Sequence, residues 1–281
     1  MSVNSRQEIK IINKFCLQDD CNCEKKQFSE KFDQNHPHND MPSANIYRLN
    51  NDCLIHIFHY LSVIDRIKIE RVCKWWKEVS QKSWHNVKKL DLRNSTWGFS
   101  SPDRLKQIDT IILHNVLSRC GKFLNEIHLA KVFSEGKEDV LFIISQSCPN
   151  VQVLDISHLV VQQPKISSLI DNCHNIRELS LNCVCLLDHD LEKLFKVNQK
   201  LKCLKLVDTE ITGKCLMHLP SKTMQEIIIE QCDYVHDNNV AEAITQLKNL
   251  KTLIINECCD VWKQTTEAVG KYCPNLETLE I

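Results

Sequence analysis

The 281-residue chain contains only five glycines and seven prolines, and it has neither a GxGxxG motif nor a Walker-type loop. A glycine-rich phosphate-binding architecture is therefore not expected. The formal net charge of -1 gives the chain no overall attraction to nucleic acid or to an anionic membrane. Long apolar runs are absent, and the first residues are polar and mixed in charge, which argues against a membrane span and a secretory signal. We expect a soluble protein of the cytoplasm, the nucleus or both, with no membrane and no nucleic-acid partner.

Cysteine, in contrast, is abundant, with 16 residues. Disulfide scaffolds are typical of short secreted chains that bury a thin core. Many of the cysteines here lie at the edges of apolar segments, for example Cys148, Cys173, Cys232, Cys258 and Cys273. A reduced thiol in such a place behaves as a small buried apolar group. We therefore expect structural thiols, and no catalytic nucleophile.

Residues 1–44 are rich in asparagine, glutamine, aspartate, lysine and serine, and their apolar residues are too sparse to form a core. This composition predicts a disordered N-terminal tail. The tail holds Cys16, Cys21, Cys23, His36 and His38, which are all possible zinc ligands. Because they include no CxxC pair, we expect neither a metal site nor a cofactor.

Residues 45–85 change to an apolar pattern with helical spacing. Leu54, Ile57, Phe58 and Leu61 follow the i, i+3, i+4, i+7 spacing that places side chains on one helical face. Asp52 lies just ahead of them, where its carboxylate could cap the helix or favour its positive end. The later part of the segment is rich in tryptophan and predicts two or three further short helices.

A repeat of the form apolar-x-x-apolar-x-apolar dominates residues 86–281. Its copies begin at Val87, Leu124, Val151, Ile176, Leu201, Met224, Leu250 and Leu276. After a first gap of 37 residues the starts are between 23 and 27 residues apart. The alternation at the end of each copy predicts a half-buried strand, and helices are expected over residues 137–147, 188–197, 239–247 and 265–272. One strand and one helix per repeat predict an α/β solenoid with parallel strands on its concave face.

The repeats resemble the cysteine-containing class of leucine-rich repeats. The segment Cys148-Pro149-Asn150-Val151 and its copy Cys273-Pro274-Asn275-Leu276 are similar to the C-P-N-L wording of that family. About eight repeats are expected, the last of them incomplete. The chain stops at Ile281, directly after the eighth expected strand, whereas repeat arrays normally need a cap. We expect this end to be truncated or covered by a partner.

Residues 46–84 resemble an F-box, whose pattern is approximately L-P-x-E-x-L-x-x-I-F-x-x-L, followed by V-C-x-x-W and a later tryptophan. The resemblance implies that this segment binds a Skp-type adaptor. The residues that it assigns to adaptor binding are Leu49, Asn50, Leu54, Ile57, Phe58, Leu61, Val72, Cys73 and Trp76. Asn50 replaces the usual proline; asparagine can also cap a helix, so we expect the helix to form and the affinity for the adaptor to be affected.

An F-box followed by leucine-rich repeats resembles the substrate receptor of an SCF-type ubiquitin ligase. The resemblance implies that the chain is not an enzyme, that its adaptor joins it to cullin and RING subunits, and that the repeats hold the protein to be modified. The alternative is a leucine-rich-repeat scaffold that uses its F-box only for assembly.

Target binding is expected on the residues that alternate with the repeat leucines. The candidates are Glu126, His128, Asp155, Glu178, Lys205, Glu226, Ile228, Glu230 and Ile254. The hypothesis is that a basic target segment lies over the carboxylates, with an apolar anchor near Ile228 on an exposed track that also includes Val207 and Ile254. The alternative is a strand face that is merely solvated.

Overall fold

The computed structural model describes residues 46–91, 110–129, 140–160, 165–183, 185–259 and 262–281. The chain divides into two compact units, Met1–His85 and Asn86–Ile281, and each is described by itself. The expected disordered tail and its cysteine and histidine cluster, residues 1–44, lie outside the described residues.

Among its described residues, the first unit contains three α-helices, and each begins after a residue whose side chain caps it. The elements are η1 (Ile46–Arg48), α2 (Asn51–His59), α3 (Val63–Ile69) and α4 (Lys74–Ser83), followed by η2 (Trp84–Asn86). Asn50 caps α2, Ser62 caps α3 and Cys73 caps α4. These caps accept hydrogen bonds from N–H groups that have no partner within the helix, which fixes where each helix starts. The cap of α2 is Asn50, and Asp52 lies within the first turn.

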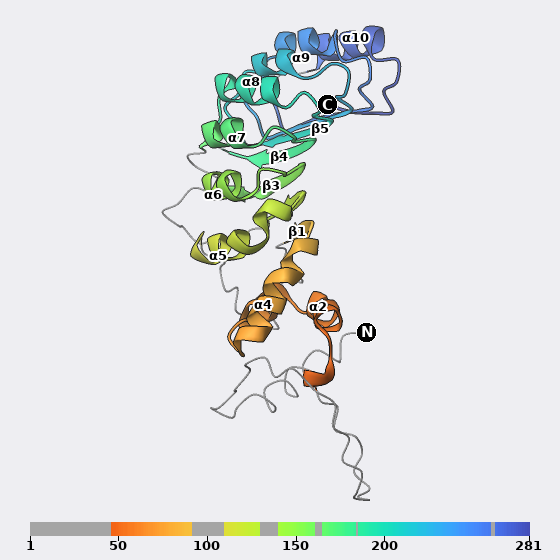
Figure 1. The fold of residues 1–281 in the computed structure, drawn as a ribbon. Helices are drawn as coiled ribbons and strands as arrows, with labels where there is room; N and C mark the ends of the chain where they lie inside the picture. The colour runs from red at the N-terminus through yellow and green to blue at the C-terminus, as the bar shows by residue number, and fades with distance from the viewer. Residues whose placement is uncertain (1–45, 92–109, 130–139, 161–164, 184, 260–261) are drawn as a thin grey trace, which may run out of the picture. The chain divides into compact units, whose positions relative to one another are not determined.

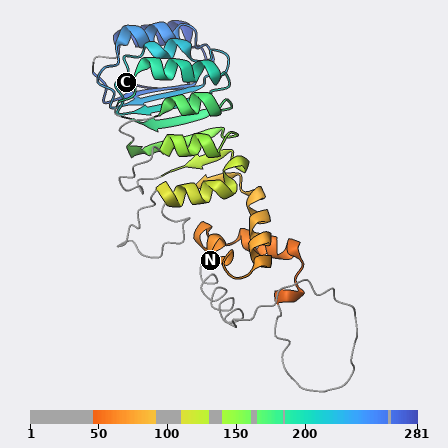
Figure 2. The ribbon, with the colours of Figure 1, turned by 60° about the vertical axis from the view of Figure 1, so that its left-hand side comes forward.

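The described residues of the second unit form a parallel sheet of eight strands, in the order of the sequence, together with the connecting helices. The strands are β1 (Lys89–Asp91), β2 (Glu126–His128), β3 (Val153–Val160), β4 (Glu178–Asn182), β5 (Cys203–Val207), β6 (Glu226–Glu230), β7 (Thr252–Asn256) and β8 (Thr278–Glu280). The expected eight strands are confirmed, and together with the helices they form a solenoid-like α/β arrangement. Figures 1 and 2 show the helices of this unit in a row along one side of the sheet.

The connecting helices are partly as expected. They are α5 (Thr110–Cys120), η3 (Gly121–Phe123), α6 (Val140–Ser147), α7 (Ile166–Asn172), α8 (Asp188–Val197), η4 (Lys214–His218), α9 (Asp237–Ile244) and α10 (Lys263–Tyr272). Helix α8 has the predicted bounds, whereas α9 and α10 each begin two residues earlier than predicted. The repeat between β5 and β6 is the shortest, and it forms the 3-10 helix η4, preceded by Gly213 with a φ of 90°.

The core of the second unit lies between the sheet and the helices. The leucines and isoleucines that alternate along the strands point into it, for example Leu204 and Leu206 on β5 and Ile227 and Ile229 on β6, which are all buried. Burying such side chains stabilises the fold by about 1.5–3 kcal/mol each. No repeat has a closed core of its own, so each depends on its neighbours.

Asparagines link successive repeats at the turns before β3, β7 and β8. The side-chain Nδ2 of Asn150 donates to the carbonyl of Lys122 at 2.8 Å. Asn275 donates to the carbonyl of Lys248 in the same way at 3.1 Å. The asparagine of the C-P-N motif therefore donates a hydrogen bond to a backbone carbonyl of the preceding repeat, which links neighbouring turns.

The buried cysteines of the repeats are free thiols that fill small spaces. Cys148, Cys173, Cys232 and Cys273 are buried, as predicted, and Cys258 is partly buried. The thiol of Cys173 donates to the carbonyl of Cys148 in the preceding repeat at 3.7 Å. Burial raises the pKa of Cys173 to about 12, so this thiol stays protonated and unreactive at neutral pH.

Candidate functional site

Helix α2 is the element of the first unit that the F-box resemblance singles out, and Asn50 sets its start. The Oδ1 atom of Asn50 accepts a hydrogen bond from the backbone N–H of Cys53 at 2.8 Å. A second bond holds the helix on α4, because the indole Nε1 of Trp75 donates to the Oδ1 of Asn51 at 2.8 Å. The asparagine at the usual proline position therefore preserves the helix start, as the sequence predicted.

The interior of the first unit contains three of the residues assigned to adaptor binding. Leu54, Phe58 and Trp76 are almost completely buried and form one cluster with Ile69 and Val79. Because these three side chains have almost no accessible surface, they pack the core of the unit, and their assignment to direct adaptor contact stays a prediction. They support helix α2 from the interior of the unit.

A buried arginine joins α3 to the end of the unit. The guanidinium of Arg66 lies over the ring of Trp84 at 4.9 Å, and its Nη2 donates to the carbonyl of His59 at 3.1 Å. The indole Nε1 of Trp84 in turn donates to a carboxylate oxygen of Glu70 at 3.1 Å. This cation–π contact and its hydrogen bonds fix α2, α3 and η2 against one another.

The outward side of α2 presents a mixed apolar and aromatic face, which we call the α2 face. Its residues are Cys53, His56, Ile57 and Tyr60. Ile57 keeps 39% and Tyr60 keeps 78% of their accessible surface. The rings of His56 and Tyr60 meet edge to face at 5.3 Å, which orders the exposed tyrosine. An exposed apolar face on so small a unit is a feature of protein-binding surfaces.

The remaining predicted adaptor residues lie at the border of this unit's core. Leu49, Leu61, Val72 and Cys73 are all half-buried and pack on the central cluster. The sulfur of Cys73 accepts the N–H of Trp76 at 3.5 Å, so this cysteine caps α4. Sequence reasoning missed Cys53, His56 and Tyr60, although their spacing of three or four residues around Ile57 places them on one side of the helix.

The outward side chains of the strands form rows across the sheet. One row joins His128, Asp155, Ser180, Lys205 and Ile228, because their strands pair in this register, and it continues to Ile254. The structure therefore brings the predicted target-binding residues to one face of the sheet. Ile228 and Ile254 are neighbours and half-exposed, as expected, whereas Val207 is only 8% exposed and does not belong to an exposed track.

Several carboxylates of this face already have partners. The Nζ atom of Lys89 lies 3.1 Å from Glu126, and that of Lys205 lies 2.8 Å from Glu230. His128 lies 3.5 Å from Asp155. These contacts reduce the attraction that the three carboxylates could offer to a basic segment.

Glu178 and Glu226 flank Cys203 in the neighbouring row of the sheet. Burial and the two carboxylates raise the pKa of the Cys203 thiol to about 11. The thiol is therefore neutral at physiological pH and offers no nucleophile. Among the described residues, no group of three histidine, cysteine or carboxylate side chains is arranged to hold a metal ion.

Residues 48–89 match the family model of the F-box-like domain. An F-box-like domain implies a role in binding a Skp-type adaptor and in assembling an SCF-type ubiquitin ligase. The chain is also similar to a Caenorhabditis elegans protein that carries the provisional name RNA-binding protein EEED8.10, with 25% identity over 246 residues. The match covers 85% of this chain and 32% of the relative, so the chain spans about a third of that protein's length. Within the described residues, no helix is long and apolar enough to cross a membrane.

Proposed function

We propose that the chain is the substrate-recognition subunit of an SCF-type ubiquitin ligase. The α2 face binds the Skp-type adaptor, which connects the chain to the cullin and RING subunits. The observation that carries the proposal is the F-box-like domain at residues 48–89, together with the exposed Ile57 on α2 and the exposed Tyr60 directly after it. The chain itself supplies no chemistry; it raises the local concentration of a target protein near the activated ubiquitin.

The second unit holds the target in this proposal, as a solenoid of cysteine-containing leucine-rich repeats. The eight sequential parallel strands and the inter-repeat asparagine bonds support that class. The target contacts proposed on the strand face are Glu126, His128, Asp155, Glu178, Lys205, Glu226, Ile228, Glu230 and Ile254. Of the carboxylates, Glu178 and Glu226 attract a basic segment most strongly, because Glu126, Asp155 and Glu230 have cationic or histidine neighbours.

RNA binding, which the name of the relative states, is not the function we propose. The strand face carries five carboxylates, at Glu126, Asp155, Glu178, Glu226 and Glu230. Carboxylates repel the phosphates that supply most of the affinity of proteins for nucleic acid.

The alternative is a scaffold that binds the adaptor without ubiquitin transfer. Co-purification of the chain with tagged adaptor, cullin and RING subunits separates the two functions. A complex that holds both adaptor and neddylated cullin supports the ligase subunit. Adaptor binding without cullin favours the scaffold, and no adaptor binding contradicts both.

A further inference from the structure

The edge of the sheet at which the strands begin carries cations from several neighbouring repeats. Backbone bonds set the register there: the N–H of Lys202 donates to the carbonyl of Arg177 at 2.7 Å, and that of Lys251 to Gln225 at 2.8 Å. Adjacent strands lie about 4.8 Å apart, so their first side chains are close neighbours. Six exposed or half-exposed cations, which we call the basic edge, lie here: Arg177, Lys200, Lys202, Lys222, Lys248 and Lys251.

Most of the basic edge lacks a neutralising partner. Lys251 pairs with Glu277 at 3.0 Å. In the part of the chain that the structure describes, no ion pair joins the other five cations to a carboxylate. Glu178 directly follows Arg177 and Glu226 directly follows Gln225, and both carboxylates belong to the strand face. At the opposite edge, where the strands end, the exposed acids Asp208, Glu210, Asp233 and Glu257 outnumber the exposed lysines Lys214 and Lys263.

The helix dipole does not account for this sorting of charge. Cations stabilise the carboxyl end of a helix, but the effect falls off within the last turn. Helix α8 ends at Val197 and α9 at Ile244, whereas Lys202 and Lys251 are the residues directly before β5 and β7. Lys202 and Lys251 therefore lie beyond the reach of the helix ends.

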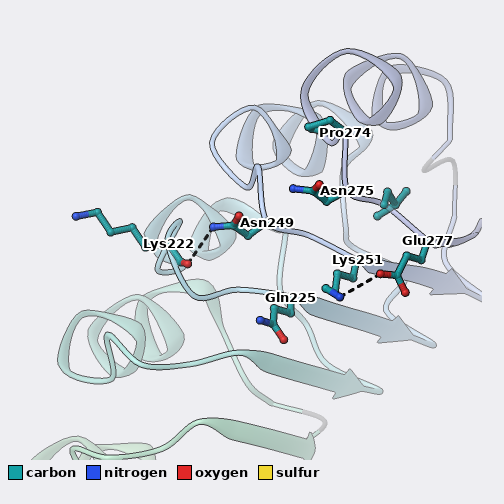
Figure 3. Close-up of a pocket in the computed structure, with 8 residues that line it drawn as sticks. Lys222, Gln225, Asn249, Lys251, Pro274, Asn275 and Glu277 are labelled. Atoms are coloured by element: carbon teal, nitrogen blue, oxygen red, sulfur yellow. Dashed lines mark hydrogen bonds and ion pairs between the residues drawn. The ribbon is translucent and has the colours of Figure 1, made fainter.

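A hollow of about 600 Å³ opens on the basic edge. Lys222, Gln225 and Lys251 line it together with the turn that precedes β8 (Figure 3). The Nδ2 of Asn249 donates to the carbonyl of Lys222 at 3.0 Å, which holds two of the lining turns together. The hollow therefore combines a fixed backbone wall with Lys222, Lys251 and the side-chain amides of Gln225, Asn249 and Asn275. Its one carboxylate, Glu277, is paired with Lys251, so Lys222 and the amides are the groups that suit a carboxylate-bearing chain.

We propose that the basic edge and this hollow bind an acidic, extended segment of a protein. The inference rests on the proposed function, because it takes the ligand to be part of the target protein. The basic edge would bind an acidic part of that target, whereas the strand face is proposed to bind a basic part. An acidic protein segment fits better than RNA, because no aromatic side chain lines the hollow, whereas proteins that bind single-stranded RNA stack its bases on aromatic rings.

Binding of labelled peptides to the full chain tests the proposal. The probe is a peptide of alternating glutamate and serine, compared with the same peptide carrying glutamine for glutamate and with a uridine oligonucleotide of equal length. The acidic peptide should bind, and added salt should weaken its binding. The glutamine peptide should bind at least about tenfold more weakly, because it lacks the charges that the edge attracts.

The double variant Lys222→Glu and Lys248→Glu should weaken binding of the acidic peptide about tenfold, because it replaces two attractions with repulsions. The matched control is Lys214→Glu with Lys263→Glu, which changes the charge equally at the other edge and should leave the affinity within about twofold. Equal unfolding midpoints for both variants show that the fold is retained.

Three results would overturn the inference: absent binding of the acidic peptide, an equal loss in the control variant, or tighter binding of the oligonucleotide. Adaptor binding is measured on the same proteins. Failure of the wild-type chain to bind the adaptor, with the peptide result intact, contradicts the proposed function alone.

Discussion

The ring of Phe58 packs against the ring of Trp76 in the centre of the first unit, with the two ring centroids 5.3 Å apart. The contact joins α2 to α4, and both side chains are almost fully buried. Such a pair stabilises the small unit through its buried area and through the tilted contact of the two rings. The F-box pattern at these two positions is therefore a requirement of the core.

Phe58→Ala should destabilise the first unit by about 3–5 kcal/mol, because it removes a buried ring and leaves a cavity. Adaptor binding should be lost through unfolding, which tryptophan fluorescence follows. A stabilising osmolyte should restore part of the binding. Lost binding by a Phe58→Ala variant that remains fully folded would show instead that Phe58 contacts the adaptor.

Asn50→Ala should destabilise the first unit by about 1 kcal/mol, since it removes the acceptor for the N–H of Cys53. Asn50→Ser is the matched control and should keep the stability near that of the wild type, because serine is also a good cap. Chemical denaturation measures both. Equal stabilities of the alanine and serine variants would contradict the capping role.

Asn198→Ala should be among the most damaging polar substitutions in the second unit. Its buried side chain accepts the N–H of Ile176 at 2.9 Å and donates to the carbonyls of Cys173 and Leu194, each at 3.1 Å. Leaving these buried groups without partners should lower the free energy of unfolding by about 2–4 kcal/mol. Asn249→Ala removes a bond at an exposed turn and should cost about 1 kcal/mol or less. Urea denaturation compares the two variants. Equal losses of unfolding free energy would contradict a special contribution of the buried Asn198 hydrogen bonds.

Asp188 should make the second unit less stable in acid. Partial burial raises the pKa of its carboxyl group. Hydrogen bonds that Cys215 and Thr212 donate to the carboxylate lower the pKa by more than burial raises it, so the pKa lies below its ordinary value. The folded pKa is depressed, so the stabilisation is complete above the ordinary pKa and is lost as the pH falls toward the folded one.

The comparison with Asp188→Asn isolates this effect. At neutral pH the asparagine variant should be less stable by about 1–2 kcal/mol, a value reduced by the partial exposure of the site. The difference should shrink as the pH falls from about 6 to about 3. A difference that is the same at every pH would exclude the carboxylate as its source.

The sequence predicted the strands well because each one depends on a local alternation of apolar residues. The bounds of α8 followed from a different local pattern, the helical spacing of Leu191, Leu194 and Phe195. The 3-10 helix η4 was not expected, because nothing in its local pattern distinguishes a shortened repeat with a left-handed Gly213 from an α-helical one.

The candidate sites were harder to predict. Leu54, Ile57 and Phe58 share one helical pattern, but only packing against α4 shows that Leu54 and Phe58 point inward while Ile57 stays exposed. The basic edge escaped sequence analysis because its cations lie in different repeats and converge only when the sheet forms. Patterns over a few residues predict local structure. Clusters whose residues come from several repeats can be recognised only once the fold is known.

The most direct test of the account is titration of the Skp-type adaptor with the wild-type chain and with Ile57→Lys, which places a charge on the α2 face. The matched control is Glu78→Lys, at an exposed position of α4. We expect the wild-type chain and the control to bind, and Ile57→Lys to bind at least about tenfold more weakly with an unchanged unfolding midpoint. A wild-type chain that does not bind the adaptor, or an Ile57→Lys variant that binds it equally well, would contradict adaptor binding through the α2 face.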